Sequence, residues 1–147
     1  MFSLIYRSVA EERFSNAEVY QMLSDARDFN AEHDITGCLL FHNRRFLQLL
    51  EGEKDKVHHL FSLIESDSRH KNIEIIQTEE KTDRLFNKWS MAFYDYGNLA
   101  LSAQIKLSQI DTFFEDSKAL KTQSRLTNPF FNEVRNMLIE RAIKRHA

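Results

Sequence analysis

The sequence has few of the residues that build covalent or phosphate-binding frameworks. It holds a single cysteine, Cys38, among 147 residues, so no disulfide can form within the chain. Its three glycines, Gly37, Gly52 and Gly97, are isolated from one another. The sequence therefore contains neither a dinucleotide-binding fingerprint nor a P-loop, because both motifs need closely spaced glycines. Any bound cofactor would have to be held by side chains and helices instead.

The charge balance gives no indication of a polyanionic partner. The formal net charge is -2 at pH 7, which provides no attraction to nucleic acid or to an anionic membrane surface. No apolar run approaches the roughly 20 residues needed to span a bilayer, and no signal-peptide core is visible. With 42% hydrophobic and 29% charged residues, the composition is that of a globular protein. We therefore expect a cytoplasmic protein that binds neither nucleic acid nor membranes.

The hydrophobic pattern predicts an α+β domain with the element order βαββαββ. Apolar segments typical of strands fall at residues 2–8, 34–41, 46–50, 73–78 and 88–93. One helix is expected after the capping box formed by Ser15 and Glu18, and a second helix is expected to open at Glu53. This order is typical of a ferredoxin-like sheet with both helices on one face.

The other face of the predicted sheet also needs a cover. Strand alternation directs Ile5, Leu47, Leu49 and Ile76 to that face, and together they are too apolar to contact water. The C-terminal part of the chain has a helical pattern. We therefore expect residues 1–97 to form one domain and residues 98–147 to form C-terminal helices that cover this second face.

A glutamine interrupts the most apolar of the predicted strands. The segment FLQLLEG at residues 46–52 is apolar on both sides of Gln48, so the carboxamide should be buried and should need hydrogen-bond partners. Tyr6 lies in a comparably apolar segment, as do Trp89 and Met91. Taken singly, Gln48 would be a satisfied core amide and Tyr6 a core aromatic residue. Taken together, these side chains indicate a shell around a polar ligand.

Several spaced motifs resemble those of the BLUF family, which are blue-light sensors that use a flavin. The motifs are LIYRS at residues 4–8, Asn30 with ITG at residues 35–37, FLQLLEG at residues 46–52, DSRH at residues 67–70 and WSM at residues 89–91. The resemblance implies a flavin held between the two helices on one face of the sheet. It also implies that Tyr6 and Gln48 are the photoactive pair, and that Trp89 and Met91 relay the signal.

The resemblance further implies a mechanism and a set of ligands. The excited flavin would take an electron and a proton from Tyr6, and a rearranged Gln48 would alter its hydrogen bond to the flavin and shift the absorption to the red. A phenol can lose both an electron and a proton. An amide can exchange its hydrogen-bond donor and acceptor ends, which a carboxylate or a lysine at position 48 could not do. The cofactor-binding residues implied are Tyr6, Met22, Asn30, Gln48, Ile64, Asp67, Arg69 and His70. The flavin would be FAD, and FMN or riboflavin would also fit.

Arg69 and His70 have two interpretations. The resemblance directs them to the phosphate side of a flavin, where the geometry of a guanidinium suits a phosphate group. Cations in the last turn of a helix also stabilise it through the macrodipole, by about 0.3–1 kcal/mol. The sequence leaves both roles open.

The chain is interpreted as a photoreceptor and not as an enzyme. The adjacent His58 and His59 face different directions on a helix and make a poor metal site. Too few residues follow the sensor to form a catalytic domain, so we expect output through an unidentified regulatory partner protein, and a homo-oligomer is also open. Two alternatives remain: a flavin- or metabolite-binding regulatory module without a light response, and a small acylphosphatase-like hydrolase.

Overall fold

The computed structural model describes residues 1–86 and 91–95, which hold two helices between five strands. The elements are β1 (Phe2–Ala10), α1 (Asn16–Glu32), β2 (Thr36–His42), β3 (Arg45–Gly52), α2 (Lys54–Glu65), β4 (His70–Glu80) and β5 (Ala92–Asp95). The predicted order βαββαββ is confirmed.

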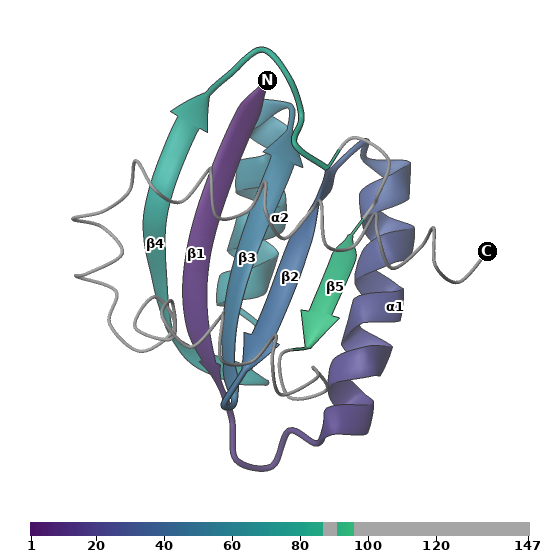
Figure 1. Cartoon of the computed structure of the whole chain (residues 1–147), viewed down its shortest axis with the longest axis vertical. Helices are drawn as coiled ribbons and strands as arrows, with labels where there is room; N and C mark the ends of the chain where they lie inside the picture. Colours follow the sequence, from purple (N-terminus) through teal and green to yellow (C-terminus); the bar gives the residue numbers. More distant parts are fainter. Residues whose placement is uncertain (87–90, 96–147) are drawn as a thin grey trace, which may run out of the picture.

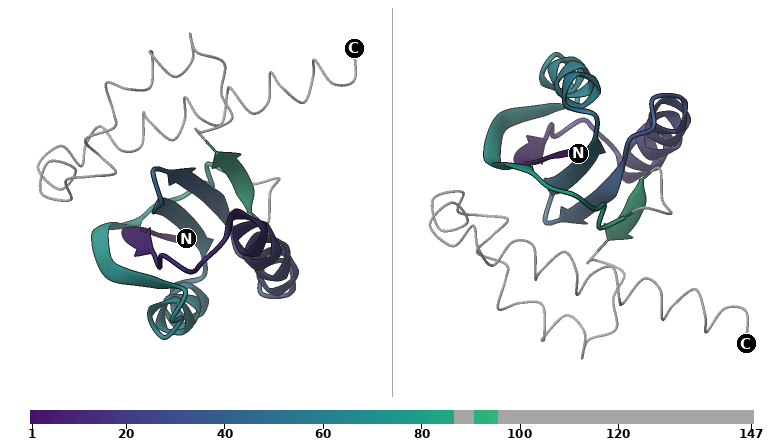
Figure 2. Two further views of the ribbon diagram at one scale, coloured as in Figure 1. Left: turned by 90° about the horizontal axis from the view of Figure 1, so that it is seen from below. Right: turned by 90° about the horizontal axis from the view of Figure 1, so that it is seen from above.

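The strands form one sheet in the order β4-β1-β3-β2-β5 (Figure 1). The first four strands are antiparallel neighbours, and β5 pairs parallel to β2 at the edge. Seen along the sheet, α1 and α2 lie on the same side of it (Figure 2). The predicted α+β, ferredoxin-like arrangement is thus confirmed for the strands and the two helices. The expected C-terminal helices, residues 98–147, lie outside the described residues.

The first helix begins where the capping box predicts. Ser15 is the N-cap, and its hydroxyl oxygen accepts a hydrogen bond from the Glu18 main-chain N–H at 3.2 Å. The Ser15 hydroxyl also donates to Glu18 Oε1 at 3.1 Å. This pairing satisfies one of the N–H groups that have no partner within the helix, and it fixes the start of α1 next to the end of β1.

The turn at residues 42–45 is a two-residue hairpin loop between β2 and β3. Asn43 and Arg44 both have positive φ, at 50° and 61°, as a type I′ turn requires, and His42 pairs with Arg45 to close it. The Arg44 guanidinium donates to the carbonyl oxygens of Glu11 and Phe14. The hairpin is thereby tied to the connection between β1 and α1.

Some strand limits differ from the prediction. β1 and β4 are longer than expected, because their pairing continues as far as Ala10 and His70. β2 begins at Thr36 and not at residue 34, because Asp34 has a φ of 53° and ends the preceding turn. β5 begins at Ala92, and residues 87–90 lie outside the described part of the chain.

The sheet buries apolar side chains on both of its faces. The core on the helix side includes Phe2, Leu4, Tyr6, Leu39, Phe46 and Leu50 from the strands, with Val19, Leu23, Val57 and Phe61 from the helices. On the opposite face Ile5, Leu47, Leu49 and Ile76 are all buried, as expected of side chains too apolar to contact water.

Gly37 allows the central strands to approach one another. A Cβ atom at this position would lie 1.9 Å from the Leu49 carbonyl oxygen, a distance that no side chain can adopt. Gly37 pairs with Leu50 across β2 and β3. A glycine is therefore required in the ITG motif to keep β3 in register beside β2.

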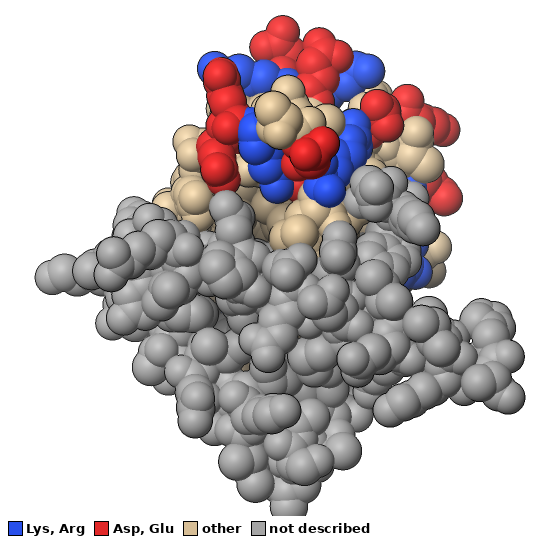
Figure 3. Space-filling model, turned by 45° about the horizontal axis from the view of Figure 1, so that its top comes forward, with Lys and Arg blue, Asp and Glu red and all other residues tan. Residues whose placement is uncertain are grey.

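Charges of opposite sign surround the end of the sheet where β3 and β4 finish. Lysine and arginine alternate with aspartate and glutamate over the described surface there (Figure 3). Lys54 pairs with Glu80 at 3.8 Å, and Arg84 pairs with Asp34 at 3.1 Å. No single sign of charge dominates this described end.

Within the described residues, no helix is long and apolar enough to cross a membrane.

A buried carboxylate anchors the segment that follows β4. Glu51 of β3 is fully buried, and its two oxygens accept hydrogen bonds from the main-chain N–H groups of Leu85 and Phe86, each at 2.8 Å. Lys81 pairs with the same carboxylate at 2.5 Å. These contacts compensate a buried charge that would otherwise be costly, and they hold residues 81–86 against the end of β3.

Candidate functional site

A cavity of about 310 Å³ lies between α1, α2 and the helix-facing side of the sheet. This volume is within the range of roughly 300–1,000 Å³ that small-molecule sites occupy. The structure brings every predicted cofactor-binding residue to its wall: Tyr6, Met22, Asn30, Gln48, Ile64, Asp67, Arg69 and His70. Their role as ligands of a cofactor remains a prediction.

Much of the apolar wall was not among the predicted cofactor-binding residues. Leu23, Ala26, Phe29, Leu39, Phe46, Leu60 and Leu63 also line the cavity, together with Asp25. Leu23 of α1 and Leu60 of α2 pack with the core on the helix side, whereas Leu63 is 47% exposed. Leu39 and Phe46 share the helix-facing side of the sheet with Gln48. Helical periodicity could have identified the helical members, but it could not distinguish a cavity wall from an ordinary core contact.

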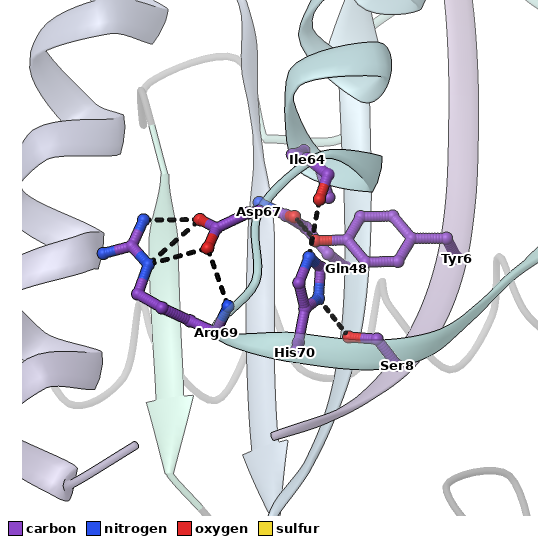
Figure 4. A network of polar contacts seen from close by, with 7 residues as sticks. All are labelled: Tyr6, Ser8, Gln48, Ile64, Asp67, Arg69 and His70. Carbon is purple, nitrogen blue, oxygen red and sulfur yellow. Dashed lines mark hydrogen bonds and ion pairs between the residues drawn. The ribbon is translucent and has the colours of Figure 1, made fainter. Parts of the chain in front are cut away.

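Tyr6 and Gln48 form the polar centre of the cavity. They lie directly opposite one another on β1 and β3, and the Tyr6 hydroxyl donates a hydrogen bond to Gln48 Oε1 (Figure 4). Both side chains are buried, with exposed fractions of 3% and 6%. The other end of the amide, Gln48 Nε2, donates to the sulfur of Met91 at 3.4 Å. The expectation of a buried amide with hydrogen-bond partners is confirmed.

The Tyr6 phenol keeps its proton. Burial raises the pKa of Tyr6 well above its ordinary value, and the negative charge of Asp67 raises this pKa further. The phenol is therefore neutral at physiological pH and can act as a hydrogen-bond donor. Its ring lies 5.5 Å from that of Phe61 of α2 and edge-on to His70 at 6.4 Å, which fixes its orientation.

His70 lies beside Tyr6 with both ring nitrogens engaged (Figure 4). Nε2 is 2.7 Å from the Ile64 carbonyl oxygen, and because a carbonyl only accepts, Nε2 carries the proton. Nδ1 is 2.8 Å from the Ser8 hydroxyl oxygen. Ile64 is in the last turn of α2, so His70 satisfies a carbonyl at the end of that helix.

Arg69 does not serve the end of α2 as a cation in its last turn. The helix ends at Glu65 and has no basic residue in that turn. Arg69 instead pairs with Asp67 at the edge of the cavity, where Nη2 to Oδ2 is 2.5 Å and Nε is 2.9 Å from Oδ1 (Figure 4). This hydrogen bonding lowers the pKa of Asp67 and raises the pKa of Arg69.

The walls of the cavity suit a flat, mostly apolar ring with polar edges. Met22 and Ile64 are partly buried against the core from α1 and α2, while Asn30 of α1 is buried with an exposed fraction of 1%. Two buried carboxamides, Asn30 and Gln48, thus line a cavity that is otherwise largely apolar. Carboxamides both donate and accept, which matches the alternating donors and acceptors of a flavin ring. The residues present therefore fit this group.

The signal-relay role of Trp89 and Met91 remains a prediction, and only Met91 lies within the described residues. Trp89 lies outside the described residues. Met91 lies directly before β5 and is buried, with an exposed fraction of 1%. Its side chain accepts from Gln48 and its main-chain carbonyl accepts a hydrogen bond from Arg27 Nε at 3.0 Å. The Arg27 contact could not be recognised from the sequence, because it joins residues far apart in the chain.

Comparison with known proteins agrees with this geometry. The chain is 36% identical over 93 residues to the blue light- and temperature-regulated antirepressor BluF of Escherichia coli, a match that spans 63% of this chain and 23% of that protein. A bacterial light-regulated adenylyl cyclase has a similar structure, with a TM-score of 0.76 and 32% identity over 83% of this chain and 36% of the cyclase. The ground state of BlsA superposes with a TM-score of 0.75 and 27% identity, over 91% of this chain and 87% of BlsA.

The antirepressor and the cyclase are thus much longer than the part that this chain matches. The family model described as sensors of blue light using FAD matches residues 1–92, which include the strands and helices that form the cavity. The cavity, the opposed tyrosine and glutamine and the sequence similarity agree, and the chain belongs to the BLUF family of flavin-using blue-light sensors.

Proposed function

We propose that this chain is a blue-light receptor that binds its flavin non-covalently in the cavity between α1 and α2. The observation that carries the proposal is the buried hydrogen bond from Tyr6 to Gln48 on the cavity wall. The ligands would be Tyr6, Met22, Asn30, Gln48, Ile64, Asp67, Arg69 and His70. A bound flavin would supply absorption of blue light and a site that accepts an electron and a proton.

Tyr6 is the source of that electron and proton in the proposed mechanism. Its phenol is protonated because burial raises its pKa, and it holds its proton in a hydrogen bond to Gln48 Oε1. Loss of this proton would remove the donor to Oε1. A neighbouring amide that can exchange its donor and acceptor ends would then be free to adopt a different arrangement.

Gln48 is weakly restrained at its other end. Its Nε2 group donates to the Met91 thioether at 3.4 Å, and a thioether sulfur is a weak acceptor. Among the described residues, little hydrogen-bond energy at Nε2 therefore opposes rotation of the carboxamide or a change of its tautomer. When the proton returns to Tyr6, Gln48 would remain rearranged and would present a different group to the flavin, which would shift its absorption to the red.

The cofactor proposed is FAD, which the family description names, and FMN or riboflavin are the alternatives. Asp67 and Arg69 lie at the edge of the cavity and are partly exposed. They would contact the part of the cofactor that extends toward solvent. Comparison of the binding affinities of the three flavins would show how much the phosphate and adenine portions contribute.

We propose that the signal passes to a regulatory partner protein and that the chain is not itself an enzyme. The family model that matches residues 1–92 describes sensors of blue light, and the similar proteins include a light-regulated antirepressor and a photoactivated adenylate cyclase subunit. Among the described residues no group of three or more histidine, cysteine, aspartate or glutamate side chains could hold a metal ion. A cytoplasmic location is part of the same proposal, and a second copy of the chain is the alternative partner.

The proposal is tested by absorption spectroscopy of the purified protein reconstituted with FAD. We expect a yellow protein whose flavin bands move reversibly to longer wavelength under blue light. A colourless preparation would contradict flavin binding. A yellow protein without a reversible shift would instead favour a flavin-binding regulatory module that does not respond to light.

A further inference from the structure

Met91 is held at both its side chain and its main chain. Its sulfur accepts from Gln48 Nε2 at 3.4 Å, and its carbonyl oxygen accepts from Arg27 Nε at 3.0 Å. Gln48 belongs to β3, whereas Arg27 belongs to α1. A single buried residue therefore connects the amide of the cavity with a helix on the other side of it.

The hydrogen bond from Arg27 to the Met91 carbonyl is significant because β5, the strand that follows Met91, is short. β5 contains four residues and pairs with β2 from Cys38↔Ala92 to Phe41↔Asp95. Met91 directly precedes the first of these pairs. A guanidinium donor gives a stronger hydrogen bond than a neutral donor, and Arg27 supplies one at this point.

Arg27 is also close in sequence to the wall of the cavity. Ala26 and Asn30 of α1 both line it, while the remainder of the Arg27 side chain reaches the exposed face of the helix. A change in the position of Met91 would alter its hydrogen bond with Arg27. Because Arg27 belongs to α1, the change would reach this helix.

We propose that Arg27 is a positioning residue that fixes the Met91 main chain, so that the Met91 sulfur meets the Gln48 carboxamide. Through this contact the arrangement of Gln48 is coupled to α1. The coupling to light rests on the proposed function, whereas the positioning of Met91 is a property of the chain in darkness.

The test compares two substitutions at Arg27 with a matched control. Arg27→Leu removes the donor. Arg27→Gln retains one, because the glutamine Nε2 is the same number of bonds from Cα as the arginine Nε. Arg13→Leu removes the same charge from an exposed arginine in the connection between β1 and α1, and is the control.

The first measurement is NMR of protein labelled with ¹³C at the methionine methyl groups, in darkness. The chain has four methionines, and the resonance of Met91 is assigned with Met91→Leu. We expect this resonance to move in Arg27→Leu, to stay near its wild-type position in Arg27→Gln and to be unchanged in Arg13→Leu. An unchanged Met91 resonance in Arg27→Leu would overturn the proposal, as would failure of Arg27→Gln to restore it.

The second measurement is the rate of dark recovery after illumination of the flavin-loaded protein. Loss of a hydrogen bond from a charged donor should change this rate at least about threefold in Arg27→Leu, with the red shift itself retained. Wild-type recovery in Arg27→Leu would also overturn the proposal. If the wild-type protein shows no light-induced shift, the proposed function fails, while the methyl resonances still decide the positioning role.

Discussion

Tyr6 and Gln48 are directly opposed residues of β1 and β3, joined by a hydrogen bond from the phenol to the carboxamide oxygen. On the other side of β1, the pairing with β4 shifts its register between Ile5 and Tyr6. Such bulges re-aim side chains and are frequent beside functional sites. The orientation of the Tyr6 side chain is thus set by the irregular pairing of β1 with β4 and by the hydrogen bond to Gln48 of β3.

Replacement of Tyr6 by phenylalanine should abolish the photocycle and leave flavin binding largely intact. Phenylalanine keeps the ring that contacts Phe61, but it has no O–H group to supply a proton. Absorption spectra before and after blue illumination would measure the reversible red shift. Tyr20→Phe, at a half-exposed tyrosine of α1 (47% exposed), is the control and should respond as the wild type does. A full red shift in Tyr6→Phe would exclude the proposed role of the phenol.

Replacement of Gln48 by leucine should also remove the reversible red shift, with a cost in stability. The Tyr6 hydroxyl would lose its buried acceptor, which typically costs about 1–3 kcal/mol. Urea unfolding would measure this cost, and light-minus-dark spectra would measure the shift. Gln77→Leu removes a carboxamide from β4 instead, where Gln77 Oε1 makes no hydrogen bond. If both variants retained the shift, the mechanism through Gln48 would be wrong.

Glu51 should be among the residues most sensitive to substitution. Its buried carboxylate binds Lys81 and the main-chain N–H groups of Leu85 and Phe86. Glu51→Ala leaves these donors without their acceptor, and loss of one partner of a buried charge pair costs about 3–5 kcal/mol. Glu53→Ala removes an exposed pairing with Lys56, which should cost less than about 1 kcal/mol. Chemical unfolding of both variants provides the comparison, and equal losses would show that the buried carboxylate is not special.

Local patterns in the sequence were sufficient to predict the order of the elements. The capping box at Ser15, the apolar segments of the strands and the burial of Gln48 all correspond to the structure. These features depend on residues close together in the chain. The length of β1 and β4 was underestimated, because it depends on pairing between residues distant in sequence, such as Ala10 with His70.

The contacts of the charged side chains could not be predicted in the same way. The sequence left Arg69 either at the phosphate side of a flavin or in the last turn of a helix, and the structure pairs it with Asp67. Glu51 was recognised only as part of the FLQLLEG motif at residues 46–52. Its role as a buried anchor depends on hydrogen bonds from Leu85 and Phe86, which follow β4 in the chain. The hydrogen bond from Arg27 to Met91 likewise requires α1 to cross near the start of β5.

The ion pair of Asp67 and Arg69 should make a pH-dependent contribution to stability. Hydrogen bonding to Arg69 lowers the pKa of Asp67 in the folded protein, so the folded state binds a proton at this carboxyl less readily than the unfolded state does. The stabilisation is therefore fully present above the unfolded pKa of about 3.9, and it is lost as the pH falls through the lower folded pKa.

The measurement is the difference in unfolding free energy between the wild type and Asp67→Asn, followed by urea denaturation from neutral to acid pH. We expect a constant difference of about 1 kcal/mol or less above pH 5, since the pair remains in contact with solvent, and a decline toward zero below about pH 4. In an Arg69→Leu background the same substitution should show a weaker pH dependence, because the hydrogen bond that lowers the pKa is absent. A difference that grows as the pH falls would contradict the direction of the Asp67 pKa shift.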